Sequence, residues 1–248
     1  MGYLLIQMMF FIVMKKNNFF QQLGIDDSWP IEQWFLEEGT RILFYLKTLA
    51  KSNINVYPER RNIFKAFSMP LQDIDVVILG QDPYHRKELA TGLAFAVKDK
   101  EHDTPTLEII RDELLNYTHR IDIDDEEVFD YTLENWHNQG ILLLNSALTV
   151  QEFSPKSHIE LWASFIELII KIIDEKENII FSLWGSSAQK FSHLINEEKN
   201  ILLKHSHPAR DKHSNNKFFT GSKVFEKIDE SLVKINKSKK QWLKNPAL

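Results

Sequence analysis

Four short apolar runs in this sequence end in polar residues of the types from which catalytic and binding sites are built. An acid, amides, a Gly-Ser turn and histidines all occur at these points. The four polar groups are Gln81-Asp82-Pro83-Tyr84-His85, Asn145-Ser146, Trp184-Gly185-Ser186-Ser187 and His205-Ser206-His207-Pro208. A turn residue would explain each group taken alone, but four together predict a site.

The apolar runs that precede these groups are predicted to be buried strands. Val76 to Leu79 is continuously apolar, and Gly80 followed by Asp-Pro ends it, because proline donates no hydrogen bond and restricts the residue before it. The other predicted strands are 141–144, 179–183 and 201–203. Helical periodicity between them, at Pro105 to Leu115 and Leu161 to Ile173, predicts an α/β fold. We expect three α/β/α layers around a central four-stranded, mostly parallel sheet.

The order of strand and polar group places the predicted site. In open parallel sheets, ligands bind outside the carboxyl ends of the strands. The four polar groups should therefore converge on one rim of the sheet.

Two interpretations that involve a metal stay open from these residues. His205 and His207 would share a strand face, although no nearby carboxylate completes a ligand set. Asp82 and His85 could instead serve a metal-dependent α/β hydrolase, and sensitivity to EDTA would favour that interpretation.

Composition limits the class of protein. The 248 residues contain no cysteine, which excludes disulfides, cysteine-bound zinc and iron–sulfur clusters. Nothing requires an oxidising compartment, so we expect a cytoplasmic protein, or a nuclear one in a eukaryote. The formal net charge of −5 argues against coating of nucleic acid by bulk charge, although one basic face is still allowed.

The amino terminus carries an unusual apolar run, Tyr3 to Met14, followed by Lys15 and Lys16. It is shorter than the roughly 20 residues of a membrane-spanning helix and lacks the charge order of a secretory signal. We interpret it as a non-native or mis-started extension, with Met14 as a candidate start. A tail that docks on a membrane surface or a partner, or a segment packed on the domain, are the alternatives. The predicted division is an extension over 1–26 and a single catalytic domain over 27–248, with no membrane partner.

The string Gly80-Gln81-Asp82-Pro83-Tyr84-His85 resembles the signature of the main family of uracil-DNA glycosylases. The resemblance extends from about Asp27 to Trp242, and its order and spacing make it specific. The other matching segments are Val56-Tyr57-Pro58, Asn62 to Phe67, Gly92-Leu93-Ala94-Phe95, Leu143-Leu144-Asn145, Leu148-Thr149-Val150, Ser157-His158, Leu183 to Lys190, His207-Pro208 and Phe218-Phe219.

The resemblance implies a DNA-repair enzyme that flips uracil out of the stack, hydrolyses its bond to deoxyribose and leaves an abasic site. It implies a monomer without cofactor or metal. Its implied partners are uracil-containing single- and double-stranded DNA and a DNA-mimicking inhibitor protein.

The resemblance assigns two catalytic residues. Asp82 would orient the attacking water and stabilise the cationic sugar. His207, as a neutral imidazole, would donate a hydrogen bond to uracil O2, with backbone amides near Gln81 completing that contact.

Three further residues would select uracil. Tyr84 would exclude the methyl group of thymine, Phe95 would stack on the base, and Asn145 would read the O4 and N3–H edge. Without the resemblance, Tyr84 is equally well a packing residue at a strand end, and Phe95 a core residue.

The resemblance also implies contacts to phosphates, which suit Gly-Ser turns and helix starts. The implied residues are Pro105, Thr106, Ser157, Gly185, Ser186, Arg210 and Lys212. The alternative for Ser157-His158 is a helix cap.

The loop after His207-Pro208 departs from the family. A leucine that wedges into the minor groove is usual there, whereas this chain has Asp211. We expect Asp211 to face phosphates unfavourably and Arg210 or Lys212 to insert or to grip the backbone. DNA binding should then be unusually salt-dependent, and flipping from duplex weakened relative to single strands.

Other departures affect the loop after His85, where Arg86 to Thr91 keeps the family's length and Thr91 replaces a usual histidine. The altered loop after His207 also permits a non-catalytic DNA-binding or scaffold protein built on the same fold. The retention of Asp82, Tyr84, Asn145 and His207 argues against a scaffold, which has no reason to keep all four.

Overall fold

The computed structural model describes residues 20–119, 128–213 and 218–244. Its centre is a four-stranded sheet in the order β3-β2-β5-β6, in which every neighbouring pair is parallel. The strands are β2 (Val76–Gly80), β3 (Ile141–Asn145), β5 (Ile180–Trp184) and β6 (Ile201–His205). The prediction of a four-stranded, mostly parallel sheet is confirmed.

Strands β2, β3 and β5 are buried along their whole length, which explains why their sequences are largely apolar rather than alternating. Their register aligns the strand ends: Gly80 lies opposite Asn145, and Trp184 lies opposite His205. The polar groups that follow the strands therefore all lie at the carboxyl ends of the strands, on the same side of the sheet.

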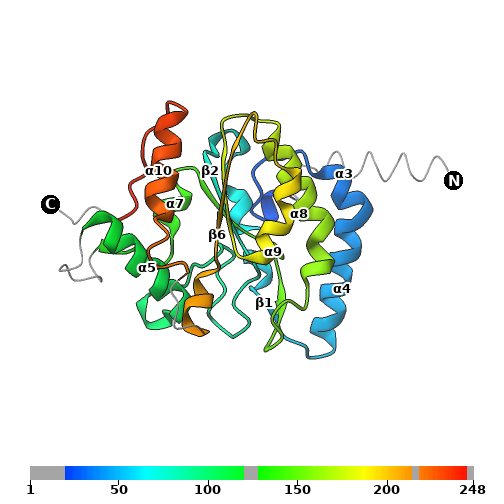
Figure 1. Cartoon of the computed structure of the whole chain (residues 1–248). Coiled ribbons are helices and arrows are strands. Elements are labelled where there is room, and N and C mark those ends of the chain that lie inside the picture. Colours follow the sequence, from blue (N-terminus) through cyan, green and yellow to red (C-terminus); the bar gives the residue numbers. More distant parts are fainter. Residues whose placement is uncertain (1–19, 120–127, 214–217, 245–248) are drawn as a thin grey trace.

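Helices cover both faces of the sheet and complete the three layers (Figure 1). On one side lie α3 (Glu32–Trp34), a π-helical turn at Phe35–Gly39, α4 (Thr40–Lys51), α8 (Ile159–Asp174) and α9 (Ser186–Gln189). On the other side lie α5 (Pro105–Thr118), α7 (Glu134–His137) and α10 (Val224–Lys234).

Short elements connect these layers. A second sheet pairs β1 (Val56–Tyr57) with β4 (Val150–Gln151) in antiparallel fashion. Turns of 3₁₀ helix occur at Arg60–Asn62, Lys65–Ser68, Leu71–Asp73, Lys100–His102, Lys190–Leu194 and Pro208–His213.

Both predicted helices form. Thr104 caps α5, since its Oγ1 accepts the backbone N–H of Leu107, and Pro105 occupies the first turn. Helix α8 buries Trp162, Phe165 and four isoleucines against the core.

Residues 20–26, which the sequence assigns to the extension, contact the body of the protein. The Phe20 ring lies 5.1 Å from that of Phe35, Ile25 is buried, and the Asp26 N–H donates to the carbonyl of Phe67. The apolar run at 3–14 and Met14 lie outside the described residues. Within the described ranges, no helix is both long and apolar enough to cross a membrane.

Candidate active site

A cavity of about 230 Å³ opens at the carboxyl ends of the strands. Segments that are far apart in sequence contribute its walls, as the strand order predicts. The lining residues are Gln81, Asp82, Pro83, Tyr84, His85, Ala90, Thr91, Gly92, Leu93, Phe95, Thr106, Asn145, Pro155, His207 and Ala209. The structure thus brings together the six residues that the resemblance assigns to catalysis and base recognition.

Gly80, the last residue of β2, allows two of these side chains to approach the strand. A Cβ atom at this position would lie 2.8 Å from Oδ1 of Asn145 and 2.9 Å from Cζ of Phe95. Only a glycine therefore fits beneath the amide and the ring.

Asn145 ends β3 and is 7% exposed. The adjacent Ser146 fixes its backbone, because the Ser146 hydroxyl and N–H both donate to the carbonyl of Gly80, at 2.7 and 3.2 Å. No hydrogen bond joins the Asn145 amide to another described side chain, so its donors and acceptor are available to a ligand in the cavity.

Phe95 lies between the core and the cavity. Its ring is 4.9 Å from Trp184 and 5.8 Å from His207, measured between centroids. Its φ of +67° is unfavourable for an aromatic residue, and such strain persists only where surrounding contacts hold it. Phe95 is therefore a buried core residue that also lines the cavity.

Tyr84 is fixed by its hydroxyl, which donates to the carbonyl of Phe95 at 2.9 Å and hydrogen-bonds Oγ1 of Thr104 at 2.8 Å. Burial raises the pKa of Tyr84, so the phenol stays protonated. The ring is thereby held rigid in the cavity wall.

Asp82 is held by two donors. Its Oδ1 accepts from the side-chain amide of Gln81 at 2.7 Å, and its Oδ2 accepts from the backbone N–H of Lys156 at 2.6 Å. Gln81 is fixed in turn, because the Ser187 hydroxyl donates to its Oε1. A carboxylate has about four lone-pair sites, so Asp82 keeps acceptor capacity for a water.

His207 is a neutral donor. Burial lowers its pKa to about 4, opposed by the charge of Asp82 and assisted by that of Lys156. The backbone N–H of Ala209 donates to Nδ1 at 3.2 Å, so the single ring proton of the neutral form sits on Nε2. His207 therefore presents one N–H donor to a ligand.

Gly185 allows the His207 segment to pack on the end of β5. Its φ is +93°, and a Cβ would lie 2.7 Å from Cβ of His207. Ser186, which follows it, is exposed at the start of α9.

Of the other predicted phosphate contacts, one lines the cavity and two lie on exposed segments close to lining residues in sequence. Pro105 is exposed, and Thr106 lines the cavity. Ser157 is exposed, and its Oγ accepts the N–H of Gln151 at 2.9 Å. His158 takes the N-cap position of α8, as the helix-cap interpretation of Ser157-His158 predicts, but its side chain does not cap the helix, because its Nδ1 pairs with Thr149.

The expectation that Asp211 faces phosphates is also wrong. The residue is 4% exposed, and its carboxylate accepts the backbone N–H groups of Phe218, Phe219 and Thr220 at 2.7 to 3.2 Å. Burial raises its pKa, but these hydrogen bonds outweigh burial and the net pKa lies below its ordinary value. Asp211 is an internal anchor that joins the two ends of its loop.

Arg210 and Lys212, on either side of Asp211, are both exposed. The Arg210 guanidinium stacks on the Phe218 ring at 3.7 Å, which leaves Lys212 as the less constrained of the two cations.

The metal interpretation of His205 and His207 lacks further ligands. In the part of the chain that the structure describes, no three His, Cys, Asp or Glu side chains are grouped as metal ligands. Burial lowers the pKa of His205 to about 4, and its Nε2 is buried without a partner.

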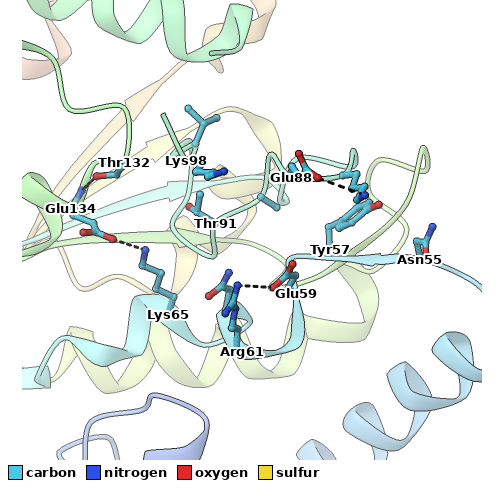
Figure 2. Close-up of a pocket in the computed structure, with 14 residues that line it drawn as sticks. Asn55, Tyr57, Glu59, Arg61, Lys65, Glu88, Thr91, Lys98, Thr132 and Glu134 are labelled. Carbon is cyan, nitrogen blue, oxygen red and sulfur yellow. Dashed lines mark hydrogen bonds and ion pairs between the residues drawn. The ribbon is translucent and has the colours of Figure 1, made fainter. Parts of the chain in front are cut away.

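Figure 2 shows a second cavity, of about 820 Å³. It shares the lining residues Ala90 and Thr91 with the first cavity. Three of its cations are paired: Lys65 with Glu134 at 2.7 Å, Arg61 with Glu59 at 3.1 Å, and Lys87 with Glu88 at 3.6 Å. It holds none of the six residues above, so the smaller cavity carries the chemistry.

Sequence reasoning missed Thr104, Lys156 and Ala209. Thr104 precedes proline and could have been recognised as a helix cap. Lys156 and Ala209 act through backbone N–H groups, which any residue but proline supplies, so no sequence signal exists for them.

Comparison with known proteins finds similarity to uracil-DNA glycosylases along most of the chain. Residues 67–233 match the family described as the uracil DNA glycosylase superfamily. The uracil-DNA glycosylase of Buchnera aphidicola (strain APS) is 41% identical over 191 residues, which cover 75% of this chain and 84% of that protein. That of Campylobacter lari is 36% identical over 235 residues, or 90% and 96% of the two chains.

Solved structures show the same fold. The crystal structure of the mimivirus uracil-DNA glycosylase has a TM-score of 0.77 at 24% identity and covers 89% of this chain and 88% of its own. A mimivirus UNG variant solved in complex with UGI has the same TM-score and identity, with 90% of each chain covered.

Proposed function

Because the chain belongs to the uracil-DNA glycosylase superfamily, we propose that it hydrolyses the bond between uracil and deoxyribose in DNA, releasing uracil and leaving an abasic site. This reaction is the first step of base excision repair. The observation that carries the proposal is the neutral His207, whose one proton is held on Nε2 in a cavity that also contains Asp82 and Asn145.

Asp82 acts on the sugar side of the bond. Its carboxylate orients a water toward the anomeric carbon and stabilises the positive charge that develops on the sugar as the carbon–nitrogen bond breaks. The bonds from Gln81 and Lys156 hold the carboxylate in place without using all its acceptor sites.

His207 acts on the base side. The electron pair of the breaking bond moves onto uracil, and negative charge collects at O2. The Nε2–H of a neutral imidazole stabilises this charge by a hydrogen bond that strengthens in the transition state.

Base selection depends on three fixed side chains. Tyr84 leaves no space for a methyl group on C5, Phe95 stacks on the ring, and the Asn145 amide pairs with O4 and N3–H. The hydrogen bonds of Tyr84 and the close approach to Gly80 support this role, because they prevent the pocket from widening.

The nucleotide must leave the helical stack to reach a cavity of this size, so we propose that the enzyme flips the base. We also propose that the enzyme is a cytoplasmic monomer. The exposed residues around the mouth, including Pro105, Ser186 and Lys212, contact the flanking phosphates. We further propose that a DNA-mimicking protein binds the same face, which the complex of a mimivirus UNG with UGI supports.

One assay tests the proposal: release of free uracil from a uracil-containing oligonucleotide, single- or double-stranded, in EDTA. We expect release by the wild-type protein and a large loss in Asp82→Asn. Absence of release from both substrates, or full activity of Asp82→Asn, would overturn the proposal, and activity restored only by metal would favour a metal-dependent hydrolase.

A further inference from the structure

Phe153 is an exposed aromatic residue beside the active-site cavity. It lies in the loop between β4 and α8, and 70% of its surface is accessible to solvent. The other large hydrophobic residues exposed in the described part of the chain are Leu36, Phe44, Tyr45 and Val233, in the π-helical turn, α4 and α10.

The loop that carries Phe153 belongs to the active site. Pro155 lines the cavity, and the backbone N–H of Lys156 holds the carboxylate of Asp82. The ring of Phe153 also meets His85, another lining residue, edge-on at 6.5 Å between centroids. Phe153 is therefore placed at the mouth of the cavity.

The backbone of this loop is tied down on both sides of the ring. The Phe153 N–H donates to the carbonyl of His85 at 2.9 Å, and the Ser154 N–H donates to that of Gln151 at 3.0 Å. The Glu152 carboxylate accepts from the Tyr57 hydroxyl at 2.7 Å and the Asn55 amide at 2.8 Å. A ring presented on such a backbone loses little conformational entropy when it binds.

The two loops that meet at the Phe153 ring also carry exposed cations. Arg86 and Lys156, on the two loops that meet here, are exposed, and neither forms an ion pair with another described residue. The nearby acid, Glu152, is already occupied by two hydrogen bonds. An exposed aromatic ring on loops that carry exposed cations matches a nucleic-acid strand with unpaired bases.

We propose that Phe153 stacks on an unpaired base next to the flipped nucleotide, so that this loop supplies the apolar DNA contact that the Asp211 loop lacks. The inference rests on the proposed function for its substrate. It predicts a preference for single-stranded DNA, because bases within a duplex are already stacked on their neighbours.

The test compares Phe153→Ala, Phe153→Leu and Phe153→Trp with Phe44→Ala, a control on α4 with a similar exposure of 71%. Affinity for uracil-free single-stranded DNA is measured by fluorescence anisotropy, and kcat and KM by uracil release. Phe153→Ala should weaken affinity and raise KM on single strands roughly 5- to 150-fold, with kcat unchanged. Phe153→Trp should retain both values, and Phe44→Ala should match the wild type.

Phe153→Leu separates stacking from simple apolar contact, because leucine keeps an apolar surface without a π-face. It should lose affinity nearly as far as Phe153→Ala. Wild-type affinity in Phe153→Ala or Phe153→Leu, an equal loss in Phe44→Ala, or a fall in kcat alone would overturn the inference. Binding to uracil-free DNA requires no catalysis. A failure of the stacking inference can therefore be distinguished from a failure of the proposed glycosylase activity.

Discussion

At the scale of single residues, the protonation of His207 decides how the leaving base is stabilised. Burial keeps the ring neutral at physiological pH, and the N–H of Ala209 selects the tautomer with its proton on Nε2. A cationic imidazole would face the desolvation penalty of a buried charge. A neutral donor stabilises the developing charge on the base without that penalty.

The first residue-scale prediction concerns His207→Ala. Loss of one donor to a developing oxyanion typically costs about 100- to 1,000-fold in rate, so kcat should fall by that factor while KM changes less. Because the pKa is about 4, His207 should not add an acid limb to the wild-type rate profile between pH 5 and 8. Single-turnover uracil release across this range measures both effects, and an inflection that disappears in His207→Ala would contradict the neutral assignment.

The second prediction concerns Asn145→Asp. The substitution removes the amide donor and adds an acceptor, which matches the amino group that cytosine carries in place of O4. Uracil release should fall roughly 5- to 150-fold, consistent with about 1–3 kcal/mol for an unpaired buried polar group, and cytosine release should become measurable. Base release from oligonucleotides that contain either base provides the measurement, and a variant that stays strictly specific for uracil would refute the role.

At the scale of elements, the loop of Pro208–His213 is organised from within. Asp211 accepts three successive backbone N–H groups and so connects the start of the loop to Phe218, Phe219 and Thr220. An aspartate occupies the place of an apolar wedge because it has become a structural anchor. Arg210 and Lys212 are left on the outer surface.

Asp211→Asn tests this anchor. An amide keeps one acceptor oxygen and loses the other, which should lower stability by about 1–3 kcal/mol and Tm by about 2–10 °C. The matched control is Lys212→Ala, which should leave Tm unchanged but weaken DNA binding at low salt. Thermal unfolding and DNA binding at two salt concentrations distinguish the two variants. An unchanged Tm in Asp211→Asn would show that Asp211 does not stabilise the fold.

At the scale of the whole molecule, four partly or fully buried histidines link stability to pH. Burial lowers the pKa of His137, His205 and His207 to about 4 each and also lowers the pKa of His158. The unfolded chain, with ordinary histidine pKa values of about 6.5, binds more protons than the folded chain between these limits. The histidines thus contribute stability that is present above pH 6.5 and is lost as the pH falls toward 4.

Tm should therefore fall steadily as the pH is lowered from 6.5 to 4. His205→Gln should flatten this slope, because it removes one of the four groups, whereas His193→Gln, at an exposed position, should not. Calorimetry at half-unit intervals of pH measures the slope, and parallel curves for the wild type and His205→Gln would show that another group is responsible.

The sequence by itself determined the four strands of the central sheet, the polar groups that follow them and the meeting of these groups at the carboxyl ends of the strands. These features are local: apolar runs, proline and glycine breaks and the Gln81 to His85 signature are readable residue by residue, and a parallel sheet aligns its strand ends. Phe95 and Tyr84 kept two interpretations, and the structure supports both, since each packs against neighbours and faces the cavity.

Only the tertiary structure decided the direction of Asp211, the tautomer of His207 and the exposure of Phe153. Each depends on backbone groups that lie close in space: Phe218 to Thr220 for Asp211, Ala209 for His207 and the His85 carbonyl for Phe153. Almost every residue has the same backbone donor and acceptor, so the sequence does not predict which side chain a given backbone group will bind. The residue types and their order predict the chemistry of this protein, whereas the arrangement of its DNA-facing loops depends on tertiary contacts.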